Sequence, residues 1–348
     1  MKKIGHFYAV THNWGDLGSA QGIKTILRSI DPELGFLDIN VNQKKVNPFK
    51  FIKLQRELNG LILGGGGVLY NRPKYASGFN FNLNYNQYSA LSIPKAFYGI
   101  GINVQKDQDA RWNMNLETEE SIKNFSTATD LVGVRDYTSL NFMKNLNAND
   151  AELVPCPSAL LLYKMYAKQR KNTVAVNLTT RGVDLRILRS ILQSISKFFI
   201  HFKIQPVLVI HDYKEDKKCI NLAKSFGINY FIPSSSENLM EFYKNQRFLV
   251  GMRGHSLIFG TGANLPMIAL SYNEKCDAHM QLIGMEKFIV PKTKFTDQHM
   301  LNEQFTALMD QEMKIRKSLN ESLSRFYKMN IQFADKFVNM LYLAHKDF

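Results

Sequence analysis

The sequence has few cysteines and no long apolar run. Its three cysteines, Cys156, Cys219 and Cys276, are odd in number and widely spaced, a pattern that fits neither a disulfide framework nor a zinc site and indicates a reducing compartment. His6 and His12 interrupt the apolar N-terminal stretch, and no window approaches roughly 18 uninterrupted apolar residues. We therefore expect a cytoplasmic protein without a signal peptide, and peripheral contact with the inner face of a membrane stays open.

Acidic residues are scarce relative to basic ones. The chain has 30 Asp and Glu against 44 Lys and Arg, which gives a formal net charge of +14. Such a surface attracts phosphates, carboxylates, nucleic acid or an anionic membrane. The basic residues are scattered and no nucleic-acid-binding motif is present, so nucleic acid is not an expected partner and a solvated surface explains the charge equally well.

The apolar content is high enough for a folded core. Hydrophobic residues make up 45% of the 348 residues, including 24 Phe and 15 Tyr. This composition excludes a disordered chain, and the length suffices for two domains of ordinary size.

Short apolar runs alternate with helical patterns, which is typical of βα units in a parallel sheet. Residues 3–10 predict a first strand and residues 17–30 a helix. The polar, basic stretch "KMYAKQRKNT" then interrupts the pattern, which resumes at "VAVNLTTRG". We place a domain boundary there, with an N-terminal domain over 1–168, a second domain over 169–295, and helices over 296–348 that pack back on the domains.

The predicted fold class is α/β, with two Rossmann-like domains of parallel strands and C-terminal helices, similar to the GT-B architecture of two-domain glycosyltransferases. In such folds ligands bind beyond the carboxyl ends of the strands, and we expect both sheets to present these ends to a common cleft. Candidate residues are therefore sought where strands end.

The first candidate motif is "THNWGDLGSAQG", which follows the first strand and opens the first helix. Backbone N–H groups around Gly15 are placed to meet an anion, with the helix dipole in support. Asn13 and Asp16 are candidate substrate contacts, although capping of the helix explains Asp16 equally well.

Four consecutive glycines, residues 64–67, come at the end of the apolar strand "GLIL". Such a run lets the backbone approach a ligand closely, at a cost in chain entropy that a plain turn would not need. We expect Gly65, Gly66 and Gly67 to form part of a ligand cradle. No Lys-Ser or Lys-Thr follows, which excludes a P-loop.

The segment "VGVRDYTS" places Arg135 and Asp136 at another strand end, with Ser139 one helical turn beyond. An arginine there is suited to planar, bidentate binding of carboxylate or phosphate. The alternative is an arginine paired with Asp136 or with an acid at a domain interface.

The strongest candidate is "GMRGHS", where Arg253 supplies a permanent positive charge. In extended chain His255 projects on the same side as Arg253, and an imidazole titrates near neutrality, as proton transfer to or from an anionic substrate requires. The alternative is a structural histidine at a helix start. "LSYNEK" ends a further strand and places Lys275 nearby.

Taken in order, these motifs resemble the polysaccharide pyruvyl transferase family over about residues 4–290. The resemblance lies in N-x-G-D after the first strand, the glycine run, "VGVRDYTS" and above all "RGHSLIFGTGANLPMIALSYNEK". It implies a transferase that moves a pyruvyl group from phosphoenolpyruvate to a hydroxyl pair of a glycan or lipid-linked sugar, forming a ketal and releasing phosphate. No metal or redox cofactor is implied.

At the matching positions, the resemblance implies that Arg135 and Arg253 bind the phosphate and the carboxylate of the donor. It implies that His255 acts as the catalytic acid and base. Many members of the family have Asp-Pro where this chain has Cys156 followed by proline. Cys156 is interpreted as a small buried thiol, with a nucleophile as the alternative.

Two other functions compete with this one. A glycosyltransferase that uses a nucleotide sugar would need cations in the same two-domain architecture. A non-catalytic binder of anionic polymer would explain the net charge without chemistry, but the scattered basic residues count against it.

Overall fold

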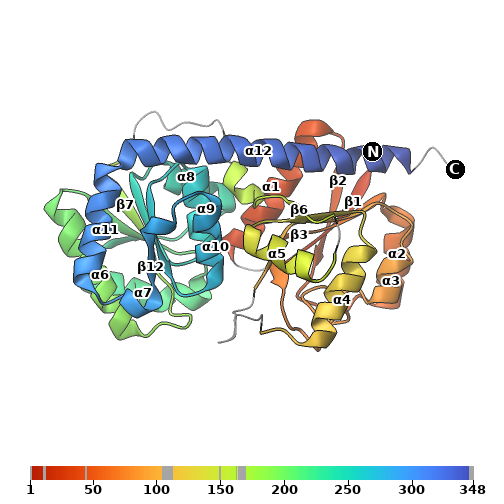
Figure 1. Cartoon of the computed structure of the whole chain (residues 1–348), viewed down its shortest axis with the longest axis horizontal. Coiled ribbons are helices and arrows are strands. Elements are labelled where there is room, and N and C mark those ends of the chain that lie inside the picture. The colour runs from red at the N-terminus through yellow and green to blue at the C-terminus, as the bar shows by residue number, and fades with distance from the viewer. Residues whose placement is uncertain are drawn as a thin grey trace. The chain divides into compact units, whose positions relative to one another are not determined.

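The computed structural model describes residues 2–10, 13–43, 45–103, 113–148, 150–161, 163 and 170–344 (Figure 1). The chain divides into two compact units. The N-terminal unit consists of Met1–Thr11, Ser19–Ser158 and Phe326–Phe348, and the C-terminal unit of His12–Gly18 and Ala159–Arg325. The boundary expected between residues 168 and 169 lies outside the described residues.

The N-terminal unit contains a six-stranded sheet in the order β2-β1-β3-β4-β5-β6, and its paired strands are parallel. Because β1 has β2 on one side and β3 on the other, the strand order reverses at β1, which is where open α/β sheets bind ligands. The strands are β1 (Lys3–Tyr8), β2 (Gly35–Asn40), β3 (Gly60–Leu69), β4 (Lys95–Ile102), β5 (Leu131–Val134) and β6 (Glu152–Leu153).

Helices cover this sheet, so that all eight residues of β4 are buried. A cluster of aromatic side chains fills part of the core, and Phe81 and Phe125 meet there edge to face at 5.6 Å between ring centroids. The helices are α1 (Trp14–Ile30), α2 (Pro48–Glu57), α3 (Tyr85–Ser89), α4 (Leu116–Thr127) and α5 (Tyr137–Asn145).

The four glycines lie inside β3 and not beyond its end, which corrects the expectation from the sequence. Gly65 and Gly66 have φ angles of 86° and 111°, and the register with β4 shifts between Gly66 and Leu69. A Cβ at Gly65 would lie 3.1 Å from the Cβ of Ser19 in α1. The glycines thus form an irregular strand segment and allow α1 to pack closely on the sheet.

The C-terminal unit contains a second six-stranded sheet in the order β12-β11-β10-β7-β8-β9, again with parallel pairs. Its strand order reverses between β7 and β10. The strands are β7 (Thr173–Asn177), β8 (Gln205–Val209), β9 (Asn229–Phe231), β10 (Phe248–Gly251), β11 (Met267–Ser271) and β12 (Ile289–Pro291).

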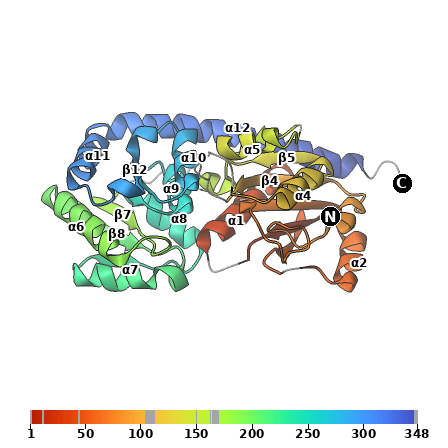
Figure 2. The same ribbon diagram turned by 60° about the horizontal axis from the view of Figure 1, so that its bottom comes forward.

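Several helices of this unit begin with polar caps, as in α7, where the Asp212 side chain accepts the backbone N–H groups of Lys214 and Glu215. Helix α6 packs on β8 (Figure 2). The helices are α6 (Leu185–His201), α7 (Tyr213–Ser225), α8 (Ser236–Lys244), α9 (Gly254–Gly262), α10 (Glu274–Leu282) and α11 (Gln298–Asp310), with short 3₁₀ helices η1 (Pro157–Leu160), η2 (Glu286–Phe288) and η3 (Lys292–Lys294).

A long helix, α12 (Glu312–Leu343), ends the described chain (Figure 1). In the C-terminal unit Arg316 donates to the carbonyl oxygen of Arg247 at 2.8 Å. In the N-terminal unit Phe333 packs edge-on against Tyr98 at 4.8 Å between ring centroids. Parallel sheets with helices and C-terminal helices confirm the predicted α/β fold class. Among the described residues, no helix is both long enough and apolar enough to cross a membrane.

Candidate functional site

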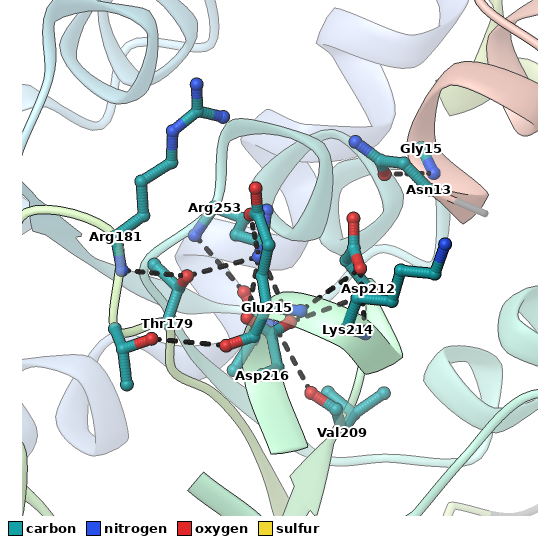
Figure 3. Close-up of polar contacts among 12 residues, drawn as sticks. Asn13, Gly15, Thr179, Arg181, Val209, Asp212, Lys214, Glu215, Asp216 and Arg253 are labelled. Carbon is teal, nitrogen blue, oxygen red and sulfur yellow. Dashed lines mark hydrogen bonds and ion pairs between the residues drawn. The ribbon is translucent and has the colours of Figure 1, made fainter. Parts of the chain in front are cut away.

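Polar side chains gather where β7, β8 and β10 of the C-terminal unit end (Figure 3). Arg253 follows β10, Thr179 follows β7, and Glu215 and Asp216 lie in the first turn of α7, after β8. Asn177, the last residue of β7, accepts the backbone N–H of Arg253 at 3.1 Å. The parallel strands therefore deliver an arginine and two carboxylates to one edge of the sheet, as the topology predicts for a binding site.

Arg253 is buried, and carboxylates already hold its guanidinium. Its Nε and Nη2 donate to the two oxygens of Asp216 at 3.1 and 2.6 Å, and Nη2 also donates to Glu215 at 2.8 Å and to Thr179 at 3.1 Å. Nη2 has two hydrogens but three acceptors. Because the Glu215 side chain is 41% exposed and that of Asp216 is 0% exposed, Glu215 is the acceptor most easily replaced.

Within this cluster the carboxylates of Asp216 and Glu215 offset the positive charge of Arg253. Burial lowers the pKa of Arg253, but the charge and hydrogen bonds of Asp216, together with the hydrogen bond to Glu215, outweigh burial and raise that pKa above its usual range. Burial raises the pKa of Glu215, but the hydrogen bond and charge of Arg253, together with the charges of Arg181 and Lys275, outweigh burial and lower that pKa. Arg253 is therefore paired through Nε and Nη2, whereas no hydrogen bond from its Nη1 is found among the described residues, and its role in binding an anion stays a prediction.

His255 lies in the first turn of α9 and not in extended chain, which corrects the geometry expected from the sequence. The backbone N–H groups of Ser256 and Leu257 both donate to the carbonyl oxygen of Arg253, at 2.9 and 3.3 Å, and so start the helix directly after Arg253. Arg253 is consequently the residue before the helix, and its side chain and that of His255 have different surroundings.

The His255 ring packs against the first turn of α1. A Cβ at Gly15 would overlap the ring, so only glycine allows this approach. Asn13 accepts the backbone N–H of Gly15 at 3.0 Å, and the backbone N–H of Trp14 donates to the carbonyl oxygen of His211 at 3.3 Å. The N-termini of α1 and α9 thus meet within the C-terminal unit, and each carries a positive helix-dipole end.

Two further predicted residues belong to this region. Asp16 lies in the first turn of α1 after the helix has begun, so its interpretation as the N-cap is wrong. Lys275 lies in the first turn of α10, and a Cβ at Gly254 would be in ordinary contact with the Cβ of Lys275, at 3.6 Å. Lys275 also contributes to the lowered pKa of Glu215.

Sequence reasoning missed Arg181 and His211. Arg181 follows β7, and its charge also lowers the pKa of Glu215; the signal was an arginine before a glycine at a strand end. His211 is buried beside the cluster, with Nε2 at 2.7 Å from the hydroxyl oxygen of Tyr243. Burial, with the charge of Arg253, lowers the pKa of His211 to about 3, so this imidazole stays neutral. A histidine ending the run "VLVIH" was its only signal.

A second cluster lies in the N-terminal unit, after β5. Arg135 donates from Nε to Asp136 at 3.0 Å, which is the ion pair considered as the alternative to substrate binding. Asp136 also accepts the backbone N–H of Ser139 at 2.7 Å and so caps α5, while the Ser139 hydroxyl accepts the backbone N–H of Ile102 at 3.0 Å. Ser139 therefore joins α5 to β4, and its hydroxyl has a structural partner.

Glycines make room for Arg135. A Cβ at Gly101 would overlap the guanidinium, and one at Gly67 would lie 3.5 Å from Nη2. Of the predicted cradle, Gly67 is thus beside Arg135, whereas Gly65 faces α1. A cation and a glycine-rich strand are brought together at this sheet edge.

Cys156 is buried, with Sγ at 3.1 Å from the Ser19 hydroxyl oxygen and at 3.2 Å from that of Ser158. This confirms the interpretation of a small buried thiol. Within the described part of the chain, no group of three or more His, Cys, Asp or Glu side chains is arranged to hold a metal ion.

Comparison with known proteins places these clusters in context. A family model described as "Polysaccharide pyruvyl transferase" matches residues 13–274. That range includes both arginine clusters and the contact between Gly15 and His255. No match was found among curated proteins.

Several solved structures share the fold at low sequence identity. The UDP-GlcNAc 2-epimerase from Neisseria meningitidis bound to UDP-GlcNAc is 11% identical, with a TM-score of 0.61 over 98% of this chain and 100% of that one. The S. aureus MnaA-UDP structure is 10% identical, with a TM-score of 0.59 over 92% and 91%. The UDP-GlcNAc 2-epimerase from Methanocaldococcus jannaschii is 12% identical, with a TM-score of 0.53 over 88% and 92%. This likeness shows the fold and confirms the GT-B-like architecture.

Proposed function

Because the chain belongs to the polysaccharide pyruvyl transferase family, we propose that it moves the enolpyruvyl group of phosphoenolpyruvate onto two hydroxyls of a sugar in a surface polysaccharide or its precursor. The products are a cyclic pyruvate ketal and phosphate. The observation that carries the proposal is the contact of His255 with Gly15, because it joins two of the predicted motifs in one place.

The reaction needs one proton donor and several positive groups. Protonation of the methylene carbon of phosphoenolpyruvate creates an oxocarbenium-like centre at C2, which one sugar hydroxyl attacks. Loss of phosphate then allows the second hydroxyl to close the ring. The two hydroxyl protons are balanced by one on the new methyl group and one on phosphate.

His255 is proposed as the group that donates and recovers this proton. General acid and base catalysis by a positioned imidazole is worth about a hundredfold to ten-thousandfold in rate. Its place in the first turn of α9, against the first turn of α1, supports this role because an anionic substrate is favoured where helix N-termini meet.

The structure changes how the positive charge is assigned. Asp216 and Glu215 already offset the positive charge of Arg253. We therefore propose that Lys275 and Arg181 neutralise more of the donor's negative charge, because both act electrostatically on Glu215. Arg253 contributes through Nη1 and through the backbone that starts α9. Arg135, in the N-terminal unit and paired with Asp136, is proposed as a further contact on the basis of the family motif.

The test is phosphate release from phosphoenolpyruvate in the presence of candidate glycans. We expect release with the wild type, and no turnover with His255→Gln while donor binding remains measurable. His299→Gln is the matched control, because His299 is an exposed histidine on α11. Near-normal turnover by the His255 variant would remove this residue from the chemistry.

The competing glycosyltransferase makes a different prediction in the same experiment. It would release a nucleotide from one member of a nucleotide-sugar panel and no phosphate from phosphoenolpyruvate. Nucleotide release that requires the same glycan acceptor would replace the proposed reaction.

A further inference from the structure

Helix α2 presents large apolar side chains to solvent. Phe49 is 86% exposed and Ile52 is 46% exposed, whereas Leu54 and Leu58 face the core. Phe49 and Ile52 are three residues apart and share one face of the helix with Lys53 and Arg56. Both views show α2 at the periphery of the N-terminal unit (Figures 1 and 2).

The charge around these apolar residues is mainly positive. Residues 41–56 include five Lys or Arg and no Asp or Glu. Lys45, Lys53 and Arg56 are exposed. The one acid of the helix, Glu57, pairs with Lys3 at 3.1 Å and with Lys53 at 3.7 Å, which leaves Arg56 and Lys45 without this carboxylate as a partner. The outer face of α2 therefore combines an unburied aromatic ring with a cationic surround.

Another exposed apolar residue of the same unit has acidic neighbours instead of basic ones. Leu116, at the start of α4, is 81% exposed, but Glu117, Glu119 and Glu120 follow it directly. Exposure of a single apolar side chain is common. It is the pairing of apolar and basic residues on one helical face that sets α2 apart from α4.

We propose that the outer face of α2, defined by Phe49, Ile52, Lys53 and Arg56, docks the protein on an anionic lipid surface. A short helix lying in the plane of a bilayer buries aromatic and aliphatic side chains at the headgroup level, and its Lys and Arg side chains meet anionic headgroups. This inference concerns a surface apart from the candidate site and stands independently of the proposed reaction.

Charge complementarity selects this occupant over the alternatives. Two copies of the chain meeting through α2 would bring two cationic faces together, which like-charge repulsion opposes. A nucleic acid would engage the basic side chains but offers no apolar layer to bury Phe49 and Ile52. Anionic lipid supplies both the negative charge and the apolar layer.

The test is co-sedimentation of the full chain with vesicles. We expect binding to vesicles of phosphatidylcholine with about 30% phosphatidylglycerol, none to phosphatidylcholine alone, and weakening as salt rises. Phe49→Ser should lower the partition coefficient about fivefold to tenfold, since an exposed phenyl ring no longer enters the bilayer. Leu116→Ser is the matched control and should bind as the wild type does.

Two further variants test separately what the charge and the apolar contact contribute to vesicle binding. Lys53→Glu with Arg56→Glu should abolish binding to the anionic vesicles without loss of folding, because both side chains are exposed. Phe49→Trp should show a blue-shifted emission only when anionic vesicles are added.

Three results would overturn the inference. One is equal binding to both kinds of vesicle, and another is equal binding by the wild type and Phe49→Ser. The third is a dimer in sedimentation velocity that Phe49→Ser dissociates, which would assign the face to a second copy of the chain.

Discussion

At the scale of residues, the main feature of the candidate site is the pairing of Arg253 with two carboxylates. Asp216 binds two guanidinium nitrogens from a fully buried position, whereas Glu215 shares Nη2 from a partly exposed one. In the proposed reaction, a donor carboxylate or phosphate at Arg253 would compete with Glu215 and not with Asp216.

Replacing this carboxylate should strengthen donor binding. In Glu215→Gln the side chain keeps its size and loses the charge that opposes an anion, so we expect the Kd for phosphoenolpyruvate to fall about threefold to tenfold. Isothermal titration calorimetry measures this directly, with Glu303→Gln on α11 as a control at a more exposed carboxylate. Weaker donor binding by the Glu215 variant would instead make Glu215 part of the binding surface.

The residue types of the candidate site and the pairing of Arg135 with Asp136 could be predicted from the sequence, but the partners of Arg253 could not. Arginine, histidine and glycine beside strand ends pointed to positions 135, 253 and 255. The carboxylates that neutralise Arg253, Asp216 and Glu215, lie in α7, 37 and 38 positions earlier in the chain, and only the tertiary fold brings them to Arg253. His211 and Arg181 were missed because a single polar residue at a strand end has no periodic pattern around it.

At the scale of elements, the candidate site depends on two helix N-termini that meet. Helix α1 starts at Trp14 and α9 at Gly254, and the His255 ring lies against the backbone of Gly15. Segment boundaries are where the sequence was least informative. The prediction of extended chain through His255 was wrong because α9 begins directly after Arg253. The prediction that the strand ends at the glycines was wrong because β3 continues through them.

Gly15→Ala tests this contact between the helices. The added Cβ overlaps the His255 ring, so the ring must move, and we expect turnover to fall at least about a hundredfold. Overpacking of this kind also costs about 1–3 kcal/mol of unfolding free energy. Steady-state kinetics and urea unfolding measure the two effects.

Gly254→Ala is the matched control for this change. Its Cβ meets only ordinary contact with the Cβ of Lys275, at 3.6 Å. Stability should therefore be close to that of the wild type. If Gly15→Ala retained full turnover, the packing of His255 on α1 would be irrelevant to function.

At the scale of the whole molecule, both units bury a neutral histidine. Burial, with the positive charge of Lys24, lowers the pKa of His6 in the N-terminal unit to about 3, and His211 in the C-terminal unit is lowered to a similar value. The α/β class could be predicted from the alternation of strand and helix patterns in the sequence. The sequence did not show that residues 326–348 belong to the N-terminal unit, because the helical pattern of the tail continues without a break.

These two histidines should make stability fall with acid. Below the ordinary histidine pKa of about 6.5 the unfolded chain binds protons that the folded chain does not, so unfolding becomes easier as pH falls toward 3. Each histidine contributes about 1.4 kcal/mol per pH unit in that window. Urea unfolding between pH 7 and pH 5 measures the slope, and His211→Gln should reduce it. An unchanged slope in that variant would mean that His211 is protonated in the folded protein.

The most direct test of the central claim follows the pyruvyl carbon. The protein is incubated with phosphoenolpyruvate labelled with ¹³C at C2 and with a panel of glycans, and the products are examined by NMR together with a phosphate assay. The account predicts a labelled ketal carbon on one glycan, with one phosphate released for each ketal, and neither product from His255→Gln. A glycan that acquires a sugar from a nucleotide donor while the labelled phosphoenolpyruvate remains intact would contradict it.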